Sequence, residues 1–470
     1  MKTFVRITVV LATTLAFIST ATSAGAAPST RAPLHTLFVS PHGHDDAVGT
    51  RRHPLRTPQA AVDRLPGGGT VRLLPGTYAR QRIVVRQRHQ LRIIGRHAVL
   101  DARGLVPLDG DSGVVQVEDS SHVTVRGLDI RGYRTTSTDK VPIGIYVTGH
   151  DEAITLAHNH VHHLGNDNPT LGSFDINAHG IAVYGRDPAT PISGLRITGN
   201  QVDHLKLGAS EAVVVNGNVD GWSVTRNHIH DVDNIGIDAI GYEETLPPAY
   251  RYTTANRARH GFIARNVVDG VVSKGNPAYW EDGPGGGEWC NCADGIYVDG
   301  GAHIVIRRNT VRRADIGIEV GAEDGRGHTD HVRVLRNRVR RSAYTGLALG
   351  GYDPQRGEVS DVTVAHNSFR NDNTLDDGSP EMILQYKLHQ LRVTRNRVTA
   401  THRAAPLVLQ RVERVGSAAQ NAGVRVDHND YGAPVGAGRA QFIWLGRTVT
   451  GFSTYRRISG QDAGSSWTRR

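Results

Sequence analysis

Residues 222–227 read WSVTRN, residues 261–266 read GFIARN and residues 304–309 read IVIRRN. In each stretch apolar and polar residues alternate before an asparagine, which places the apolar side chains on one face of a strand. The pattern recurs at spacings of 27 to 43 residues and ends at Gly95, Gly127, Asn159, Asn200, Asn227, Asn266, Asn309, Asn337, Asn367, Asn396 and Asn429. A repeated unit of this length indicates a solenoid. Because Gly and Asn tolerate a left-handed backbone, we expect tight turns at these positions, with the asparagines stacked as a structural ladder.

A second set of strands alternates with these stretches. It reads GIYV from Gly144, GIAV from Gly180, AVVV from Ala212, GIDA from Gly236, GIYV from Gly295, GIEV from Gly317 and GLAL from Gly346. Placed side by side, about 4.8 Å apart, these strands would form one parallel sheet. We therefore predict an all-β fold, a single-stranded right-handed parallel β-helix with an N-terminal cap and loop insertions, in which successive coils bury each other's faces.

The N-terminus has the features of a secretory signal peptide. Lys2 and Arg6 precede an apolar run over residues 7–23, and small residues follow at 24–26. No later stretch approaches the roughly 20 apolar residues of a transmembrane helix. We expect a secreted, extracellular protein that does not contact a membrane. Its expected parts are the signal peptide (1–26), a flexible N-terminus (27–36), the β-helix domain (37–465) with insertions near 242–258 and 270–293, and a C-terminal tail (466–470).

Charge and cysteine content restrict the partners. The formal net charge is +9, and 54 residues are Lys or Arg. A basic exported protein could meet an acidic polysaccharide, a nucleic acid or an anionic cell wall, or the charge could simply solvate the surface. Since no helical basic motif or zinc-finger spacing occurs, we expect no nucleic-acid partner, and we expect a monomer. Cys290 and Cys292 could pair in an oxidising compartment or remain free thiols.

The first ordered segment resembles a known group of proteins. Residues 38–78 read FVSPHGHDDAVGTRRHPLRTPQAAVDRLPGGGTVRLLPGTY. This segment is similar to the N-terminal cap and first coil of the pectate-lyase-like right-handed parallel β-helix superfamily, and especially to family 9 polysaccharide lyases. Near the other end, Phe452, Tyr455 and Gly460-Gln461-Asp462 resemble the closing segment of secreted carbohydrate-active β-helix proteins. The resemblance implies the fold but leaves the reaction open, because the superfamily holds lyases, hydrolases, epimerases and non-catalytic proteins.

Acidic residues gather on three adjacent strands of the second set. With the residues one and three places after each glycine facing the core, those two and four places after it should face solvent. These outward positions include Asp238, Tyr297, Asp299 and Glu319, and Asp315 lies at the edge of the same strands. Neighbouring carboxyl groups cannot all ionise cheaply, so one of them should keep its proton and act as a general acid. We expect Asp238, Glu319, Asp299 and Asp315 to form the catalytic group of a sugar-cleaving site, with an acidic solvated face as the alternative.

The two insertions bring aromatic side chains close to these carboxyl groups. Aromatic faces with a polar edge suit sugar rings, and long loops on a rigid scaffold often carry function. The expected substrate-binding residues are Tyr297, Tyr242, Asn216, Asn234, Trp280 and Tyr344. His179, Glu211 and Glu381 stand one residue before the aligned strands and are candidates for supporting roles. The other histidines fall on predicted outer turns, without a pattern that suggests a metal site.

Three functions remain open. The first is hydrolysis of glycosidic bonds in a polysaccharide or oligosaccharide by paired carboxyl groups, with no cofactor required. The second is Ca²⁺-dependent elimination, as the resemblance to lyases implies, with Asp233 and Asp294 joining Asp238 and Asp299 as metal ligands and Lys274 as the base. The third is a non-catalytic glycan-binding or cell-wall protein, and an epimerase acting on an acidic polymer is a further alternative.

Overall fold

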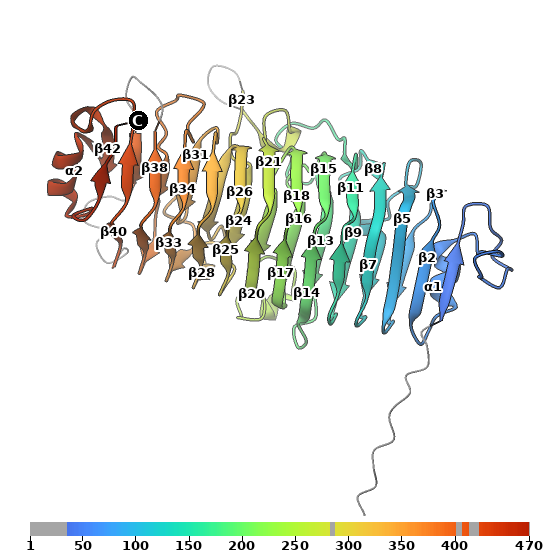
Figure 1. Cartoon of the computed structure of the whole chain (residues 1–470). Coiled ribbons are helices and arrows are strands. Elements are labelled where there is room, and N and C mark those ends of the chain that lie inside the picture. The colour runs from blue at the N-terminus through green and yellow to red at the C-terminus, as the bar shows by residue number, and fades with distance from the viewer. Residues whose placement is uncertain (1–34, 283–286, 401–406, 413–422, 470) are drawn as a thin grey trace, which may run out of the picture. The chain divides into compact units, whose positions relative to one another are not determined.

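Each coil contributes three strands to the computed structural model, which describes residues 35–282, 287–400, 407–412 and 423–469. The coil that contains Asn159 consists of β9 (Lys140–Gly149), β10 (Thr155–Ala157) and β11 (His160–His162). Every one of these strands pairs in parallel with its counterparts in the neighbouring coils. The predicted parallel β-helix is confirmed, and the coils follow one another in chain order through the unit His35–Arg470 (Figure 1). The expected signal peptide and most of the flexible N-terminus lie outside the described residues.

Within the described residues, most strands belong to one 13-stranded and one 24-stranded sheet. The 13-stranded sheet comprises β4 (Ile83–Arg86), β6 (Gly110–Glu118), β9, β13 (His179–Gly185), β16 (Val213–Gly217), β19 (Ile237–Ile240), β24 (Asp294–Asp299), β27 (Ile316–Gly321), β31 (Thr345–Leu349), β35 (Met382–Leu384), β39 (Leu407–Arg411), β42 (Gln441–Trp444) and β43 (Arg447–Thr450).

The 24-stranded sheet consists of two rows of strands that meet at the asparagine turns. The first row holds β1 (Thr36–Val39), β2 (Gly69–Leu73), β5 (Leu91–Asp101), β7 (Thr124–Arg131), β10, β14 (Ile192–Thr198), β17 (Val219–Thr225), β20 (Ala258–Ala264), β25 (Val305–Arg307), β29 (Arg333–Leu335), β33 (Thr363–Ala365), β37 (Arg392–Thr394) and β40 (Arg425–Asp427). The second row holds β3 (Gly76–Ala79), the ends of β5 and β7, β11, β15 (Gln201–Leu205), β18 (His228–Val232), β21 (Val267–Val271), β26 (Thr310–Ala314), β30 (Arg338–Arg340), β34 (Ser368–Arg370), β38 (Arg397–Thr399), β41 (Asp430–Gly432) and β44 (Ser466–Trp467).

The predicted asparagine ladder is present. The Nδ2 atom of Asn159 donates to Oδ1 of Asn200 at 3.1 Å and to the carbonyl oxygen of Val125 at 3.1 Å. The same side-chain link joins each asparagine to the next as far as Asn429. Since these amides are buried, their hydrogen bonds avoid the cost of an unsatisfied polar group in the core.

At the asparagine turns the left-handed residue is not the one expected, whereas Gly127 itself is left-handed, at φ 71°, as predicted. The left-handed residue is the one before each asparagine, for example His158 at φ 54°, Arg226 at φ 55° and Arg308 at φ 54°. The asparagine itself does not have a positive φ. Its side chain stabilises the turn through the ladder, and this offsets the strain of a left-handed residue with a Cβ atom.

Short helices lie near both ends of the β-helix. The predicted N-terminal helix is α1 (Pro58–Asp63), capped by the Thr57 hydroxyl, and α2 (Phe452–Ser459) lies near the C-terminus. Between them, stacked Val, Ile and Leu side chains from all coils form one hydrophobic core. The last strand, β44, reaches Trp467, so regular structure continues two residues into the segment expected to be a tail.

The two predicted insertions leave the coil rhythm. The first carries η1 (Pro248–Tyr250), and the second carries η2 (Pro277–Tyr279) and the hairpin β22 (Trp280–Glu281) with β23 (Glu288–Trp289). Cys290 and Cys292 form a disulfide, which settles the alternative that the sequence left open. The remaining small elements are β8 (Arg134–Thr135) with β12 (Gly165–Asn166), β28 (His328–Asp330) with β32 (Glu358–Ser360) and β36 (Leu388–His389), and η4 (Ala437–Arg439).

Candidate active site

Three predicted residues form a row across the 13-stranded sheet. Asp238 on β19 is the direct register partner of Tyr297 on β24, and Tyr297 is the partner of Glu319 on β27. Their side chains point away from the core, as the alternation predicted. Asp238 and Glu319 are therefore separated by two strand spacings, about 9–10 Å.

The row is not solvated, which corrects the expectation that these positions face solvent. Asp238 is 2% exposed, Tyr297 3% and Glu319 6%. Groups from later in the chain lie against the row: the Tyr297 hydroxyl donates to the Glu323 carboxylate, and Tyr344 lies within electrostatic reach of Glu319. The outward face of these strands is therefore the floor of a covered site.

Asp294 and Glu319 form a carboxyl pair. Their side chains lie within hydrogen-bonding reach of each other, and Asp294 is 3% exposed. Burial, together with the neighbouring Glu323, raises the pKa of Glu319 to about 8. Burial and the facing Glu319 also raise the pKa of Asp294 well above its ordinary value. Near neutral pH the pair therefore keeps a proton, as a general acid requires.

Asp238 and Asp299 extend this acidic group. Burial raises the pKa of Asp238, and the negative charges of Glu211 and Asp299 raise it further. Burial and Glu323 have the same effect on the pKa of Asp299, whose Oδ1 accepts the backbone N–H of Glu323 at 2.6 Å. The cluster can therefore hold both protonated and ionised carboxyl groups at one pH.

A cavity of about 460 Å³ opens on the same sheet, over β6, β13 and β16. His179 and Tyr184 line it, and the Nδ1 of His179 lies 3.1 Å from the Glu211 backbone oxygen. Because a carbonyl oxygen can only accept, Nδ1 carries the proton and Nε2 accepts the Tyr184 hydroxyl at 3.0 Å. Burial lowers the pKa of His179 to about 4, so its ring is neutral at pH 7.

The cavity and the acidic group share a border. Nδ1 of His179 lies 3.4 Å from Oε2 of Glu211, one of the charges that raise the pKa of Asp238. On the cavity wall, Asn216 Nδ2 donates to Glu243 at 2.6 Å, and Arg186 forms an ion pair with Asp111. Asn216, predicted to bind substrate, therefore belongs to the cavity wall, although it is buried and its Oδ1 accepts the Thr245 hydroxyl.

Two residues that were predicted to belong to the active site have structural roles instead. Asp315 is fully buried, and its Oδ2 accepts the backbone N–H and hydroxyl of Ser273 and the backbone N–H of Ala293, at 2.8, 2.6 and 3.2 Å. It thereby fastens both ends of the second insertion instead of joining the row. Tyr242 is 7% exposed and packed between Tyr252 and the Arg257 guanidinium, so its ring offers no open face for stacking.

Three further predicted residues do not belong to the row. Asn234 donates to the Tyr279 hydroxyl and to the Ser210 carbonyl, which connects it to the covering insertion. Tyr344 packs beside Ile316 and Ala348. Trp280 packs against Trp289, and its Nε1 donates to Asp282 within the hairpin.

The proposed calcium ligands are not brought together. Asp233 accepts the Leu207 backbone N–H at 2.6 Å, and the charges that act on it are those of Lys206 and Arg134. Within the described ranges, Asp233, Asp238, Asp294 and Asp299 provide no three ligand atoms within 4.8 Å of one another. Lys274 is exposed in the second insertion. These four carboxyl groups therefore do not form a calcium site.

Sequence reasoning missed several residues of the site. Tyr184 stood in an aligned outward column, and its neighbour His179 was held only as a supporting candidate. Asp111 and Arg186 lie outside the acidic coils, and Glu243 and Glu323 follow their strands in loops, so strand alignment carried no signal for these four.

Fold and site together define a β-helix protein with a covered acidic row beside an open cavity. The chain belongs to the same family as the uncharacterized protein YwoF of Bacillus subtilis (strain 168), with 31% identity over 432 residues, which is 91% of this chain and 86% of the relative. A search of protein-family models found no match. The A-module of mannuronan C-5 epimerase AlgE6 from Azotobacter vinelandii has a similar fold, with TM-score 0.50, 15% identity, and coverage of 87% of this chain and 92% of the module. Among the described residues, no helix is both long and apolar enough to cross a membrane.

Proposed function

We propose that this protein is a carbohydrate-active enzyme that cleaves glycosidic bonds in a polysaccharide lying along the outward face of the 13-stranded sheet. The row Asp238, Tyr297 and Glu319, with Asp294 paired to Glu319, is the observation that carries the proposal. The solved structure with a similar fold is named as an enzyme that acts on mannuronan, a polysaccharide, which supports a sugar polymer as the class of substrate.

Hydrolysis by paired carboxyl groups would use Asp238 and Glu319 once the side chains that cover the row move aside for the sugar. Glu319, whose pKa is raised to about 8, would protonate the leaving oxygen, and Asp294 would donate a hydrogen bond to the Glu319 carboxylate that forms. Asp238, two strands away, would activate water from the other side of the sugar. The separation of about 9–10 Å is close to the range of about 6.5–9.5 Å found for inverting pairs. Asp299 would tune the ionisation of Asp238.

The test is a panel of neutral and acidic polysaccharides scored for new reducing ends. We expect Glu319→Gln and Asp238→Asn each to reduce the rate at least 100-fold. Gln116→Ala is a matched control, because Gln116 occupies the same column of the sheet four strands before Asp238. Full activity in both carboxyl variants would reject this site.

The cavity favours a second candidate, proton abstraction from an acidic sugar. The neutral His179 ring and the Tyr184 hydroxyl form an acid–base pair that lines open space, as elimination or epimerisation would need. Under this candidate, His179→Gln and Tyr184→Phe abolish activity and no reducing ends form by hydrolysis. Elimination would give ultraviolet-absorbing products, and epimerisation would change the sugar without cleavage. Binding without either change would indicate a non-catalytic glycan-binding protein.

As part of the same proposal, the protein is secreted and monomeric. The Cys290–Cys292 disulfide supports an oxidising compartment, as the N-terminal sequence predicted. Detection of the mature chain in culture medium and its mass by light scattering test these two points.

A further inference from the structure

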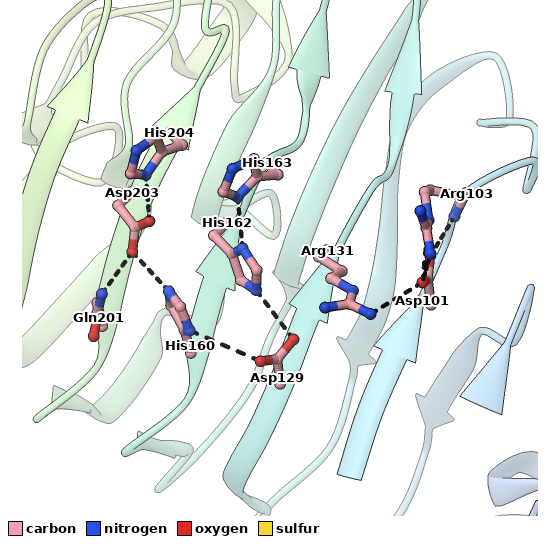
Figure 2. A network of polar contacts seen from close by, with 10 residues as sticks. All are labelled: Asp101, Arg103, Asp129, Arg131, His160, His162, His163, Gln201, Asp203 and His204. Carbon is pink, nitrogen blue, oxygen red and sulfur yellow. Dashed lines mark hydrogen bonds and ion pairs between the residues drawn. The ribbon is translucent and has the colours of Figure 1, made fainter. Parts of the chain in front are cut away.

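A second group of polar side chains lies on the 24-stranded sheet. His160, Val161 and His162 form β11, and Val161 is fully buried, so both imidazoles point outward. The register places Asp129 of β7 beside His160, and Asp203 of β15 beside His162 (Figure 2). The expectation that these histidines lie scattered on turns was wrong, because His160 and His162 belong to a strand with carboxylates on both sides.

Three atoms of this group converge. Oδ1 of Asp129 lies 3.1 Å from Nε2 of His162, and its Oδ2 lies 3.8 Å from Nδ1 of His160. One ligand atom from each of the three residues lies within 4.8 Å of the other two. Tetrahedral ligands at about 2.0–2.2 Å from a zinc ion are roughly 3.3–3.6 Å apart, so the observed spacing suits one ion.

The second nitrogen of each imidazole already has a partner. Nε2 of His160 lies 2.7 Å from Oδ1 of Asp203, which is 3% exposed. Since a carboxylate accepts, Nε2 of His160 carries the proton and the lone pair of Nδ1 faces Asp129. Nδ1 of His162 lies 2.7 Å from Nδ1 of His163, which leaves Nε2 of His162 directed at Asp129 (Figure 2). Metal-binding histidines are held in this way by a carboxylate or another acceptor behind them.

The guanidinium of the neighbouring Arg131 does not pair with Asp129. Arg131 is the register partner of His162, but its guanidinium pairs with Asp101 at 3.3 Å, and Arg103 pairs with the same carboxylate (Figure 2). Asp129 therefore has the imidazoles as its facing groups. The side chains of Asp129 and His160 are 31% and 35% exposed, so an ion can enter from solvent and keep a water ligand.

We propose that Asp129, His160 and His162 form a binding site for a divalent transition-metal ion, with Zn²⁺ as the best match to two imidazoles and one carboxylate. Asp203 and His163 position the two ligand rings. The site lies on a different sheet from the carboxyl row and is independent of the proposed activity. Three protein ligands leave one coordination position of the ion open to solvent. This position could hold a water molecule on a structural ion, or an exogenous ligand that exchanges with that water.

The experiment is a Zn²⁺ titration of the full chain without a polyhistidine tag, by calorimetry against a competing chelator, repeated with Co²⁺ and its visible absorption. We expect one ion at the tightest site and a zinc-dependent rise in melting temperature. Asp129→Asn, which keeps the shape of the side chain, and His162→Ala should each weaken this site more than 100-fold. Asp203→Asn should weaken it by about 10–100-fold, as expected for a group behind a ligand.

His303→Ala supplies the control, because His303, Asp330 and His331 form a group of the same composition elsewhere in the described part of the chain. Unchanged tight binding in this variant supports the assignment. Tight binding that survives His162→Ala, or that is lost equally in His303→Ala, overturns it. Absence of binding by the folded wild-type chain also overturns it, and leaves the group as a set of histidine–aspartate ion pairs.

Discussion

At the scale of single residues, the site depends on carboxyl groups that are buried close to one another. Each of the four on β19, β24 and β27 would ionise readily in water, yet burial and mutual repulsion raise the pKa of all of them. Burying carboxyl groups in this way lowers the stability of the folded protein, and such a cost is typical of sites where function needs a protonated acid.

Glu319 gives a pH-dependent prediction. Its pKa is about 8 in the folded protein, against an ordinary value of 4.5. Between these values the unfolded chain loses the proton and the folded chain keeps it, so stability falls as the pH rises through this window. Glu319→Gln mimics the protonated form and should remove part of this fall. The difference in melting temperature between variant and wild type should therefore grow from pH 5 to pH 9.

Glu118→Gln serves as the comparison, since Glu118 lies on β6 of the same sheet and pairs with the exposed Arg86. A pH dependence unchanged by Glu319→Gln would show that Glu319 does not keep its proton in the folded protein.

At the scale of elements, the strands and their register could be predicted because the two-residue side-chain period and the recurring Asn leave one consistent alignment. The column of Asp238, Tyr297 and Glu319 follows from that alignment alone. Its burial could not be predicted, because Glu323 reaches Tyr297 from a loop whose path depends on tertiary contacts. The triad of Asp129, His160 and His162 was missed for a related reason: its members gather only once β7 and β11 are placed side by side.

The ladder predicts the cost of losing one asparagine. Asn266→Ala removes the oxygen that accepts two hydrogen bonds from Asn227 and the amide that donates to Val224 and Asn309. The partners of these bonds are then left as buried, unsatisfied polar groups. We expect a loss of about 2–4 kcal/mol in the free energy of unfolding, measured by denaturant. Gln355→Ala, at an exposed turn, should change it by less than about 0.5 kcal/mol. Equal effects would mean that the ladder is not a stabilising element.

Asp315 predicts the behaviour of the second insertion. Asp315→Asn places an amide where three donors now converge, so both ends of the insertion should loosen. Hydrogen exchange should accelerate at Ser273 and Ala293 while the ladder stays protected. Asp282→Asn, at the exposed hairpin, should leave exchange at those two residues unchanged. Unaltered exchange in Asp315→Asn would assign the anchoring of the insertion to other contacts.

At the scale of the whole unit, each coil packs on its two neighbours, so stability should be transmitted from coil to coil. The last link is Asp462, a buried carboxyl that receives the hydroxyls of Tyr431, Tyr455 and Ser465 and lies beside Asn429, the end of the ladder. Asp462→Ala leaves two buried tyrosine hydroxyls without their partner and opens the C-terminal end of the core. Protection from hydrogen exchange should then be lost first in β44 and β41, next in β38, and not in the coils of Asn159 and Asn200. A uniform loss of protection along the chain would instead show that the unit unfolds as a single cooperative body.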